Sequence, residues 1–425
     1  MQERNWAGNL AYGAADVEQP DSVSQLQDIV RRSHRVRTLG TRHSFNDIAD
    51  TTGTLISLGR LDHVVRLDAA SRTVTIEGGV RYGQLGDYLH ARGYALRNMA
   101  SLPHISVAGA CATASHGSGV RHGNLATSVS AMEIVSSDGE LDALSRDTHG
   151  DTFDGMVVSL GALGVITQLT LAVVPTFQLR QEVYENLPLA AAVSHFDEIQ
   201  RLAYSVSLFT DWRNDRFTQV WLKREVDADV PGSVERELFG ATLATANMHP
   251  LPGLSPESCT AQMGMPGAWC DRLPHFRMAF TPSSGAELQS EYFVAYQHAG
   301  AALEAIMRIG ADIAPQLLVS EVRTIAADAL WMSPCHGSAC VAIHFTWKPD
   351  WPGVQRVLPL IESALAPFDP RPHWGKLFTM SAGVVRSRYQ RLDDFRRLVE
   401  EHDHTGTFSN PFIDRYVFGA RPSPP

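Results

Sequence analysis

Two glycine-rich stretches, each with a histidine, are the parts of this sequence best suited to hold a large ligand. The first is Gly40-Thr41-Arg42-His43-Ser44-Phe45, and the second covers residues 109–119 and contains His116. Small residues let the backbone approach a ligand closely, and successive backbone N–H groups in such turns form concavities that hold phosphate oxygens. The two stretches therefore predict a phosphate-bearing cofactor, with His43 and His116 presented beside it.

Two expected strands, 317–324 and 340–347, carry polar side chains at alternating positions. Because side chains two residues apart share a face, Glu321 lies on the same side as Arg323, and His344 on the same side as Thr346. If both strands belong to one sheet, these four side chains meet on one surface. The alternative is a solvated sheet face with a surface Glu–Arg pair. Against it, a histidine and a threonine in an apolar strand would be costly unless they were used.

A third concentration of functional groups is Arg371-Pro372-His373-Trp374-Gly375-Lys376, where the chain is expected to leave its middle region. A lone lysine is usually a solvated surface residue. Here a tryptophan, a glycine and a histidine precede it, so that a functional role and a surface position both stay open.

The five cysteines form no recognisable framework. Their number is odd, their spacing fits no zinc pattern, and no export signal argues for disulfides. We therefore expect small buried thiols and no metal, and we interpret Cys111 in the second glycine stretch as a small residue that fits there.

Size and composition favour a two-domain globular protein. The chain has 425 residues, 44% of them hydrophobic, and a formal net charge of −10 without a basic cluster. Nucleic acid and anionic membranes are therefore poor candidate partners. The stretch 160–174 is too short and too often interrupted for a membrane span, and it reads as strands. Since no export signal is visible at Met1, we expect a cytoplasmic protein, and we expect a monomer.

The elements that must position these groups follow from periodicity and from Gly and Pro breaks. Helices are expected over 20–35, 82–92, 301–309 and 389–402, and strands over 36–39, 54–58, 64–67, 73–77, 129–135, 205–210, 217–223 and 291–296. Residues 137–140 predict a hairpin turn, and 160–167 a turn that ends as a strand. The second glycine stretch is expected to be a loop, and 225–285 a long irregular insertion. Pro175 is taken as a domain boundary.

With these features in view, the sequence resembles the vanillyl-alcohol-oxidase family of FAD enzymes, and within it the branch that oxidises alditols. The resemblance spans almost the whole chain and rests on the order of the two glycine–histidine stretches and the closing strand Gly164-Val165-Ile166-Thr167. Further similar segments are 40–46, 98–109, 205–212, 273–277, 283–292, 321–324 and 373–376. Similar enzymes have glycine where this chain has Arg42, and Gly-Thr where it has Ala114-Ser115. Both replacement residues at the second site are small, so that the pyrophosphate cradle should survive.

The resemblance implies an α+β chain with a two-domain FAD-linked oxidase fold. It would consist of a PCMH-type FAD-binding domain (1–175), an α+β substrate domain (176–374) and a C-terminal segment (375–425) that returns to the FAD-binding domain. His43 matches the histidine to which the flavin is covalently attached, and that imidazole must be neutral and nucleophilic. The residues matched to FAD binding are Gly40, Thr41, Arg42, His43, Ser44, Phe45, Ser101, Ser106, Gly109, Thr113, Ala114, Ser115, His116, Val165, Ile166 and His373.

The resemblance also implies a polyol pocket lined by Ser101, Glu321, Arg323, His344, Thr346 and Lys376. Such a set offers both donors and acceptors to a chain of hydroxyls, and it rejects analogues that lack one. The implied reaction is oxidation of a terminal CH₂OH of xylitol, sorbitol or a similar polyol to the aldose. Hydride passes to flavin N5 and O₂ is reduced to H₂O₂. The implied catalytic residues are Arg323 and Lys376, which stabilise developing negative charge, and His344, the titratable candidate for the base.

Two other functions remain open at this point. An aldonolactone oxidase or dehydrogenase would have a similar FAD-binding domain, and the polar set around Glu321 argues for the polyol instead. A flavin-binding protein without turnover is less compatible with an intact His43 and a fully polar pocket.

Overall fold

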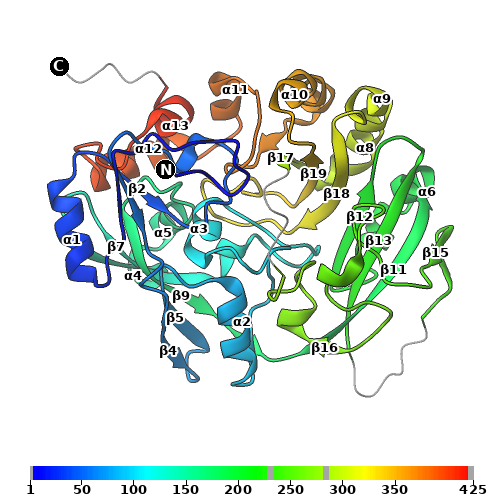
Figure 1. Ribbon diagram of the computed structural model, residues 1–425, viewed down its shortest axis with the longest axis horizontal. Coiled ribbons are helices and arrows are strands. Elements are labelled where there is room, and N and C mark those ends of the chain that lie inside the picture. Colours follow the sequence, from blue (N-terminus) through cyan, green and yellow to red (C-terminus); the bar gives the residue numbers. More distant parts are fainter. Residues whose placement is uncertain (1–2, 227–233, 281–286, 420–425) are drawn as a thin grey trace.

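The first part of the chain forms a five-stranded antiparallel sheet with a smaller parallel sheet beside it. The computed structural model describes residues 3–226, 234–280 and 287–419. The antiparallel sheet has the order β4 (Val64–Asp68), β5 (Thr73–Glu77), β9 (Val165–Ala172), β7 (Val129–Val135), β8 (Leu141–Ser145). The parallel sheet has the order β1 (Asp16–Glu18), β3 (Thr54–Ser57), β2 (Val36–Leu39). Figure 1 shows both on the left, in blue to green.

Short helices surround these two sheets, and β6 (Tyr94–Ala95) pairs with β10 (Val174–Pro175). The helices are α1 (Val23–Arg32), α2 (Tyr82–His90), α3 (Val107–Ala112), α4 (Arg146–His149) and α5 (Asp151–Val157). Helix α1 begins at Ser22, whose side chain accepts a hydrogen bond from the backbone N–H of Gln25. Its buried residues, Leu26, Ile29 and Val30, are spaced three and one apart and so form a single apolar face.

A large, mainly antiparallel sheet occupies the middle of the chain and the right of Figure 1. Its order is β14 (Glu237–Leu238), β15 (Ala241–Leu243), β11 (Gln178–Pro188), β13 (Arg216–Glu225), β12 (Ser205–Thr210), β18 (Leu317–Ile325), β19 (Cys340–Trp347), β17 (Leu288–Ala295), β20 (Arg371–Pro372). Strand β16 (Gly267–Ala268) pairs with β11 outside this path. The accompanying helices are α6 (Leu189–Ser194), α7 (Phe196–Gln200), α8 (Ala299–Arg308), α9 (Gly310–Ile313) and α10 (Trp351–Leu365).

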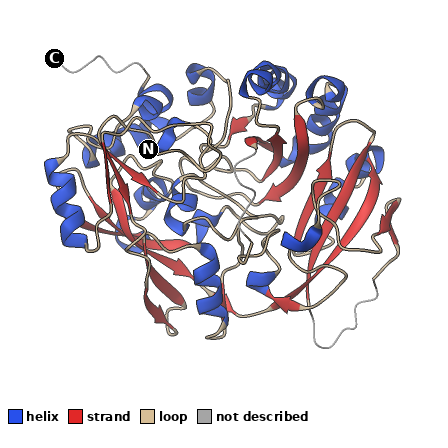
Figure 2. Ribbon diagram, viewed as in Figure 1, coloured by secondary structure: helices blue, strands red, loops and turns tan. Residues whose placement is uncertain are grey.

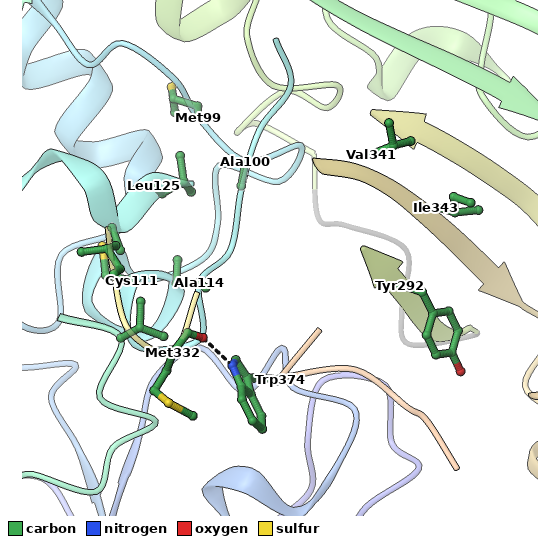
Figure 3. Close-up of a cluster of buried hydrophobic side chains, with 14 of the residues drawn as sticks. Met99, Ala100, Cys111, Ala114, Leu125, Tyr292, Met332, Val341, Ile343 and Trp374 are labelled. Carbon is green, nitrogen blue, oxygen red and sulfur yellow. Dashed lines mark hydrogen bonds between the residues drawn. The ribbon is translucent and has the colours of Figure 1, made fainter. Parts of the chain in front are cut away.

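One face of β17 and β19 is apolar and belongs to the main core. Val341, Ile343, Phe345 and Trp347 are fully buried and share that core with α8 and α10. The Tyr292 hydroxyl donates to Glu362 Oε1 of α10 at 2.8 Å. Figure 3 shows Tyr292, Val341 and Ile343 on their strands, opposite Cys111 and Ala114 of the first part of the chain. The polar residues at the alternating positions must therefore point the other way.

The end of the chain lies beside its beginning, as the red and blue helices of Figure 1 show. It contains α11 (Ala382–Ser387), α12 (Leu392–His402) and α13 (Pro411–Ile413), followed by a π-helical turn at Asp414–Phe418. The Asn410 side chain donates to the carbonyls of Asp47, Ile48 and Asp50 at 2.9–3.1 Å. Arg37 donates to the Phe408 carbonyl at 2.9 Å. In the described part of the chain, no helix has the length and apolar character that a membrane crossing requires.

Most of the predicted elements are confirmed, and Figure 2 shows their distribution as helices and strands. The strands over 36–39, 73–77 and 129–135 have the expected bounds, and the tail helix is shorter than predicted, at Leu392–His402. Within 225–285 the described residues form short strands, turns and two short 3-10 helices, Pro256–Ser258 and Trp269–Asp271. Residues 227–233 and 281–285 of that prediction, like 283–286 of the resembling segment 283–292, lie outside the described residues.

The loop predicted for the whole second glycine stretch is wrong for its first residues. Helix α3 runs through Gly109 to Ala112, because long-range contacts outweigh the weak helix propensity of glycine. The N–H of Val107 donates to the Val80 carbonyl at 2.9 Å, and the N–H of Leu160 donates to the Ala112 carbonyl at 3.0 Å. Cys111 lies inside this helix, and burial raises the pKa of its thiol to about 12, as expected for a packing residue.

Candidate active site

Strands β17, β18 and β19 present one buried polar face. Glu321 is the register partner of His344, and His344 is also the partner of Glu291 on β17, so the three side chains share a face. Glu321, Arg323, His344 and Thr346 are 5–7% exposed. The prediction that these four residues meet on one surface is therefore confirmed. The alternative, a solvated face with a surface ion pair, is wrong.

Glu291 lies at the centre of this face and is the main residue that the sequence reasoning missed. Its fully buried carboxylate accepts from Lys376 Nζ at 2.7 Å and from Arg323 Nη2 at 3.0 Å, and His116 Nε2 lies 3.2 Å away. Burial opposes its ionisation, but Lys376, His116 and Arg323 outweigh burial and hold the pKa of Glu291 well below its usual range. Glu291 is therefore an ionised hub for two cations.

Lys376 is not a solvated surface lysine. Its Nζ donates to Glu291 Oε2 at 2.7 Å and to His344 Nδ1 at 2.8 Å, and burial lowers its pKa. The segment around it is fixed from two sides: Asn46 donates to the Lys376 carbonyl at 2.8 Å, and the Trp374 indole donates to the Met332 carbonyl at 2.7 Å (Figure 3). This arrangement leads the chain from β20 back toward the first glycine loop.

The contacts of His344 determine its tautomer. Its Nδ1 accepts from Lys376, so Nε2 carries the proton and donates to Thr346 Oγ1 at 3.1 Å. Burial, reinforced by Lys376, lowers the pKa of His344 to about 3. The imidazole is neutral at physiological pH, but both of its nitrogens are occupied. To accept a proton at Nδ1, His344 must first release Lys376.

Arg323 joins the large sheet to the first part of the chain. Its Nη1 donates to Ser101 Oγ at 3.2 Å, and its Nε lies 3.5 Å from Glu321 Oε1. The Ser101 carbonyl in turn accepts from the backbone N–H groups of His275 and Phe276 at 3.0 and 3.3 Å. Ser101 therefore lies between the two main sheets, next to the polar face.

Glu321 keeps one oxygen free. Its hydrogen bond from His275 Nε2, at 2.8 Å, and its contact with Arg323 both end on Oε1. Among residues 3–226, 234–280 and 287–419, no partner lies on Oε2. Burial disfavours the ionised form, but Arg323 and the bond from His275 overcome it and keep the pKa of Glu321 below its usual range. An ionised carboxylate oxygen is thus left to accept hydrogen bonds from a ligand.

The first glycine loop holds His43 in a neutral, partly buried state. Its Nδ1 is 3.1 Å from Thr41 Oγ1, and the Trp6 ring stacks on the imidazole at 5.2 Å. Burial lowers the pKa of His43 to about 4, and in the described part of the chain its buried Nε2 has no hydrogen-bond partner. The Phe45 N–H donates to the Gly375 carbonyl at 2.8 Å, which ties the loop to the segment that carries Lys376.

The two positions where similar enzymes have glycine keep the left-handed backbone. Arg42 has a φ of 64° and Ala114 a φ of 54°, a region that costs an L-residue about 1–2 kcal/mol. At Arg42 the strain is offset by the Trp6 N–H, which donates to its carbonyl at 2.8 Å, and by an ion pair with Glu3. The backbone path of the loop is therefore kept without the glycine.

The remaining residues predicted for the cofactor fall into two groups. Thr41 and Ser106 join the two glycine stretches, since Ser106 N donates to Thr41 Oγ1 at 3.2 Å. Thr113 Oγ1 lies 3.3 Å from Ser115 Oγ, and the Ser44 hydroxyl lies beside Gly375. His116 and His373 are buried, with ring centres 6.3 Å apart. Ile166 belongs to the main core, whereas the Val165 side chain packs in the separate cluster under α1. The structure therefore does not bring the Val165 side chain to the others.

These residues fit an FAD. Gly40 and Gly109 expose their backbone, and a Cβ on either would lie 2.7 or 2.8 Å from Ser106 Oγ, so the strip of bare backbone between the two stretches depends on both glycines. The unpartnered, neutral Nε2 of His43 points to a group that completes it. The structure thus supports the cradle that the glycine stretches predicted.

Comparisons with known proteins agree with this fit. Residues 14–145 match the family described as FAD binding domain, and residues 286–416 match D-arabinono-1,4-lactone oxidase. An alditol oxidase of Streptomyces sp. is 49% identical over 96% of this chain and 97% of its own length. An L-gulono-1,4-lactone dehydrogenase of Mycobacterium tuberculosis is 27% identical over 97% of this chain and 98% of its own length.

Solved structures confirm the predicted fold class. Cholesterol oxidase from B. sterolicum has a TM-score of 0.76 at 13% identity and covers 98% of this chain and 96% of its own. A solvent-stable cholesterol oxidase has a TM-score of 0.77 at 15% identity and covers 97% of this chain and 96% of its own. At such identities the likeness concerns the FAD-linked oxidase fold alone.

Proposed function

The chain belongs to the alditol oxidase family of FAD-dependent oxidases, and on this basis we propose that it oxidises a terminal primary hydroxyl of a polyol to the aldose. The family assignment rests on the 49% identity to the Streptomyces alditol oxidase over nearly the whole chain. Xylitol and sorbitol are the proposed substrates, O₂ is the proposed electron acceptor, and H₂O₂ is the second product.

The observation that carries this proposal is the free, ionised oxygen of Glu321 on a buried face that otherwise has its charges paired. Glu321 and Glu291 balance Arg323 and Lys376, so a neutral ligand fits and a charged one would be unpaired. Glu321 Oε2 accepts from a substrate hydroxyl, while Ser101 and Thr346 can each donate or accept. A polyol satisfies such a set along its whole chain of hydroxyls.

Bound FAD would supply the acceptor for a hydride from the alcohol carbon and would pass the electrons on to O₂. The residues of this chain then have the following proposed roles. Glu321 and Ser101 orient the polyol, and Arg323 and Lys376 face the developing negative charge. His344 accepts the hydroxyl proton at Nδ1, which Lys376 must first release. Lys376 then either donates to the substrate instead or keeps only its hydrogen bond to Glu291. A pKa of about 3 leaves the ring unprotonated in the neutral range but makes it a weak base, so the proposed proton transfer depends on Lys376 leaving Nδ1.

We further propose that FAD is attached to His43 and contacts residues 40–45, Ser106, Gly109, 113–116 and His373. The neutral imidazole with its unpartnered Nε2 supports this attachment. The division into 1–175, 176–374 and 375–425 is likewise a proposal, supported by the separate sheets and by the contacts of Asn410 with residues 47–50. A monomer in the cytoplasm stays a prediction.

A second candidate function is oxidation of an aldonolactone, because residues 286–416 match D-arabinono-1,4-lactone oxidase. The test is a peroxide-coupled assay of the purified yellow protein with xylitol, sorbitol, mannitol, glycerol and a galactonolactone. We expect peroxide with the polyols. Peroxide with the lactone alone would replace the polyol proposal, and a flavin that neither substrate bleaches without oxygen would refute both.

A further inference from the structure

A buried lysine on β13, two strands from Glu321 in the large sheet, has all its hydrogen-bonding capacity used. Lys223 on β13 is 1% exposed. Its Nζ donates to the Leu273 carbonyl at 2.5 Å, to the Pro274 carbonyl at 3.1 Å and to His275 Nδ1 at 3.1 Å. Burial lowers the pKa of Lys223 to about 7; in its charged form the ammonium group has three N–H donors and no acceptor, and these three partners saturate it. Such a costly residue is tolerated in a core only where it is used.

The ionised carboxylate of Glu321 sets the tautomer of His275. Because a carboxylate only accepts, Nε2 carries the proton and donates to Glu321 Oε1 at 2.8 Å, which leaves Nδ1 to accept from Lys223 at 3.1 Å. Burial lowers the pKa of His275 to about 4, so the ring is neutral and cannot donate from both nitrogens at neutral pH. Phe209 and Trp221 meet the ring edge-on at 5.7 and 5.2 Å and fix its orientation.

The sheet register explains why these groups meet. On β12, which lies between β13 and β18, Phe209 pairs with Glu321 and Ser205 pairs with Lys223. Phe209 and Ser205 are four residues apart, so they point to the same face, and Lys223 and Glu321 point there with them. The segment of His275 packs over this face and links the two side chains across three strands.

We propose that Lys223 and His275 are positioning residues that hold Glu321 Oε1 turned inward and so present Oε2 to a substrate hydroxyl. This inference rests on the proposed function, since the polyol is the ligand that Oε2 serves. It makes Glu321 a fixed acceptor, which discriminates against substrate analogues without a hydroxyl at that point. Neither residue touches the substrate in this arrangement.

The test uses the flavin-loaded enzyme and xylitol in anaerobic stopped-flow, which separates the substrate dissociation constant from the limiting reduction rate. His275→Leu removes the donor to Glu321 and should raise the dissociation constant about tenfold or more, the scale of a hydrogen bond to a charged group. His275→Gln keeps an N–H near the position of Nε2 and should restore most of the affinity. Lys223→Met should fall between the two. His249→Leu is the matched control, since His249 packs against Phe276 without contacting Glu321.

The decisive comparison is made in the Glu321→Gln background. If His275 acts through Glu321, His275→Leu has almost no further effect there, because the group it positions is already changed. If the two effects multiply, or if His275→Gln binds xylitol no better than His275→Leu, the inference is wrong. If the wild-type flavin is not reduced by any polyol, the proposed function fails. The positioning of Glu321 by His275 is then tested without substrate. In that case ¹⁵N spectra of the histidine rings should show His275 protonated at Nε2 in the wild type; protonation at Nδ1, or a mixture of the two tautomers, would overturn the inference.

Discussion

Of the carboxylate-to-amide substitutions on the polar face, Glu291→Gln should destabilise the protein most. The carboxylate holds Lys376 at 2.7 Å and Arg323 at 3.0 Å, with His116 at 3.2 Å. An amide keeps one acceptor but turns an NH₂ group toward a cation, and the face changes from neutral to a net charge of +1. Breaking a buried ion pair by removing one partner costs about 3–5 kcal/mol, and the retained acceptor offsets about 1 kcal/mol. We therefore expect a loss of about 3 kcal/mol.

Urea unfolding of the flavin-loaded protein at pH 7 measures this loss. Glu362→Gln is the matched control, because Glu362 accepts from Tyr292 and Thr379 but forms no ion pair with any described residue, and it should cost about 1 kcal/mol. In a Glu291→Gln background, Lys376→Met should cost less than it does alone, since it removes a cation that has lost its counter-charge. The role of Glu291 as a hub would be refuted if Glu291→Gln and Glu362→Gln lost equal free energy of unfolding and if the effects of Glu291→Gln and Lys376→Met were additive.

Four further outcomes follow from the same geometry. His43→Ala should release all its flavin into the supernatant on acid precipitation, whereas wild-type protein stays yellow at its chain mass; free flavin from the wild type would contradict the covalent attachment. Lys376→Met should lower the anaerobic reduction rate about 10²-fold with little change in polyol affinity, and the reverse pattern would make Lys376 a binding residue. Arg42→Gly should be about 1 kcal/mol more stable than Arg42→Ala by urea unfolding, because of the φ of 64°. Burial lowers the pKa of His275 to about 4 and that of His344 to about 3, so below about pH 6.5 the unfolded chain takes up protons that the folded rings do not. The free energy of unfolding should therefore fall with pH below 6.5, by about 1.4 kcal/mol per pH unit for each ring until its folded pKa is reached. Urea midpoints at pH 7 and 5 that coincide would exclude this.

The sequence was sufficient where the pattern is local. The alternation in 317–324 and 340–347 predicted the face of Glu321 and His344, because the side-chain period of a strand is independent of what surrounds it. Their burial followed from the apolar residues on either side. The first glycine loop was also chosen from local residues, and the role of His43 in it stays a prediction.

Prediction from the local sequence failed where contacts with residues distant in the sequence determine the backbone conformation. Helix α3 forms in a glycine-rich stretch because Val80 and Leu160 satisfy its backbone, and neither contact is visible from residues 105–119. Arg42 keeps the conformation expected of a glycine because Trp6 and Glu3 hold it. In both places tertiary contacts override propensity.

Glu291 shows most clearly what could not be predicted from the sequence alone. It follows Gln289 and Ser290 in 288–295, so it does not stand out as His344 does in the apolar run 340–347, and the argument that an unused polar group would be costly was weaker there. What was missing was the register: only the pairing of β17 with β19 places Glu291 beside His344, and only the return of the chain through β20 brings Lys376 to it. The same holds for Lys223 and His275, which meet Glu321 across β12. A buried charge in a strand therefore indicates a site, while the identity of its partners requires the fold. In this chain those partners distinguish Glu321, the proposed acceptor for substrate, from Glu291, which balances charge.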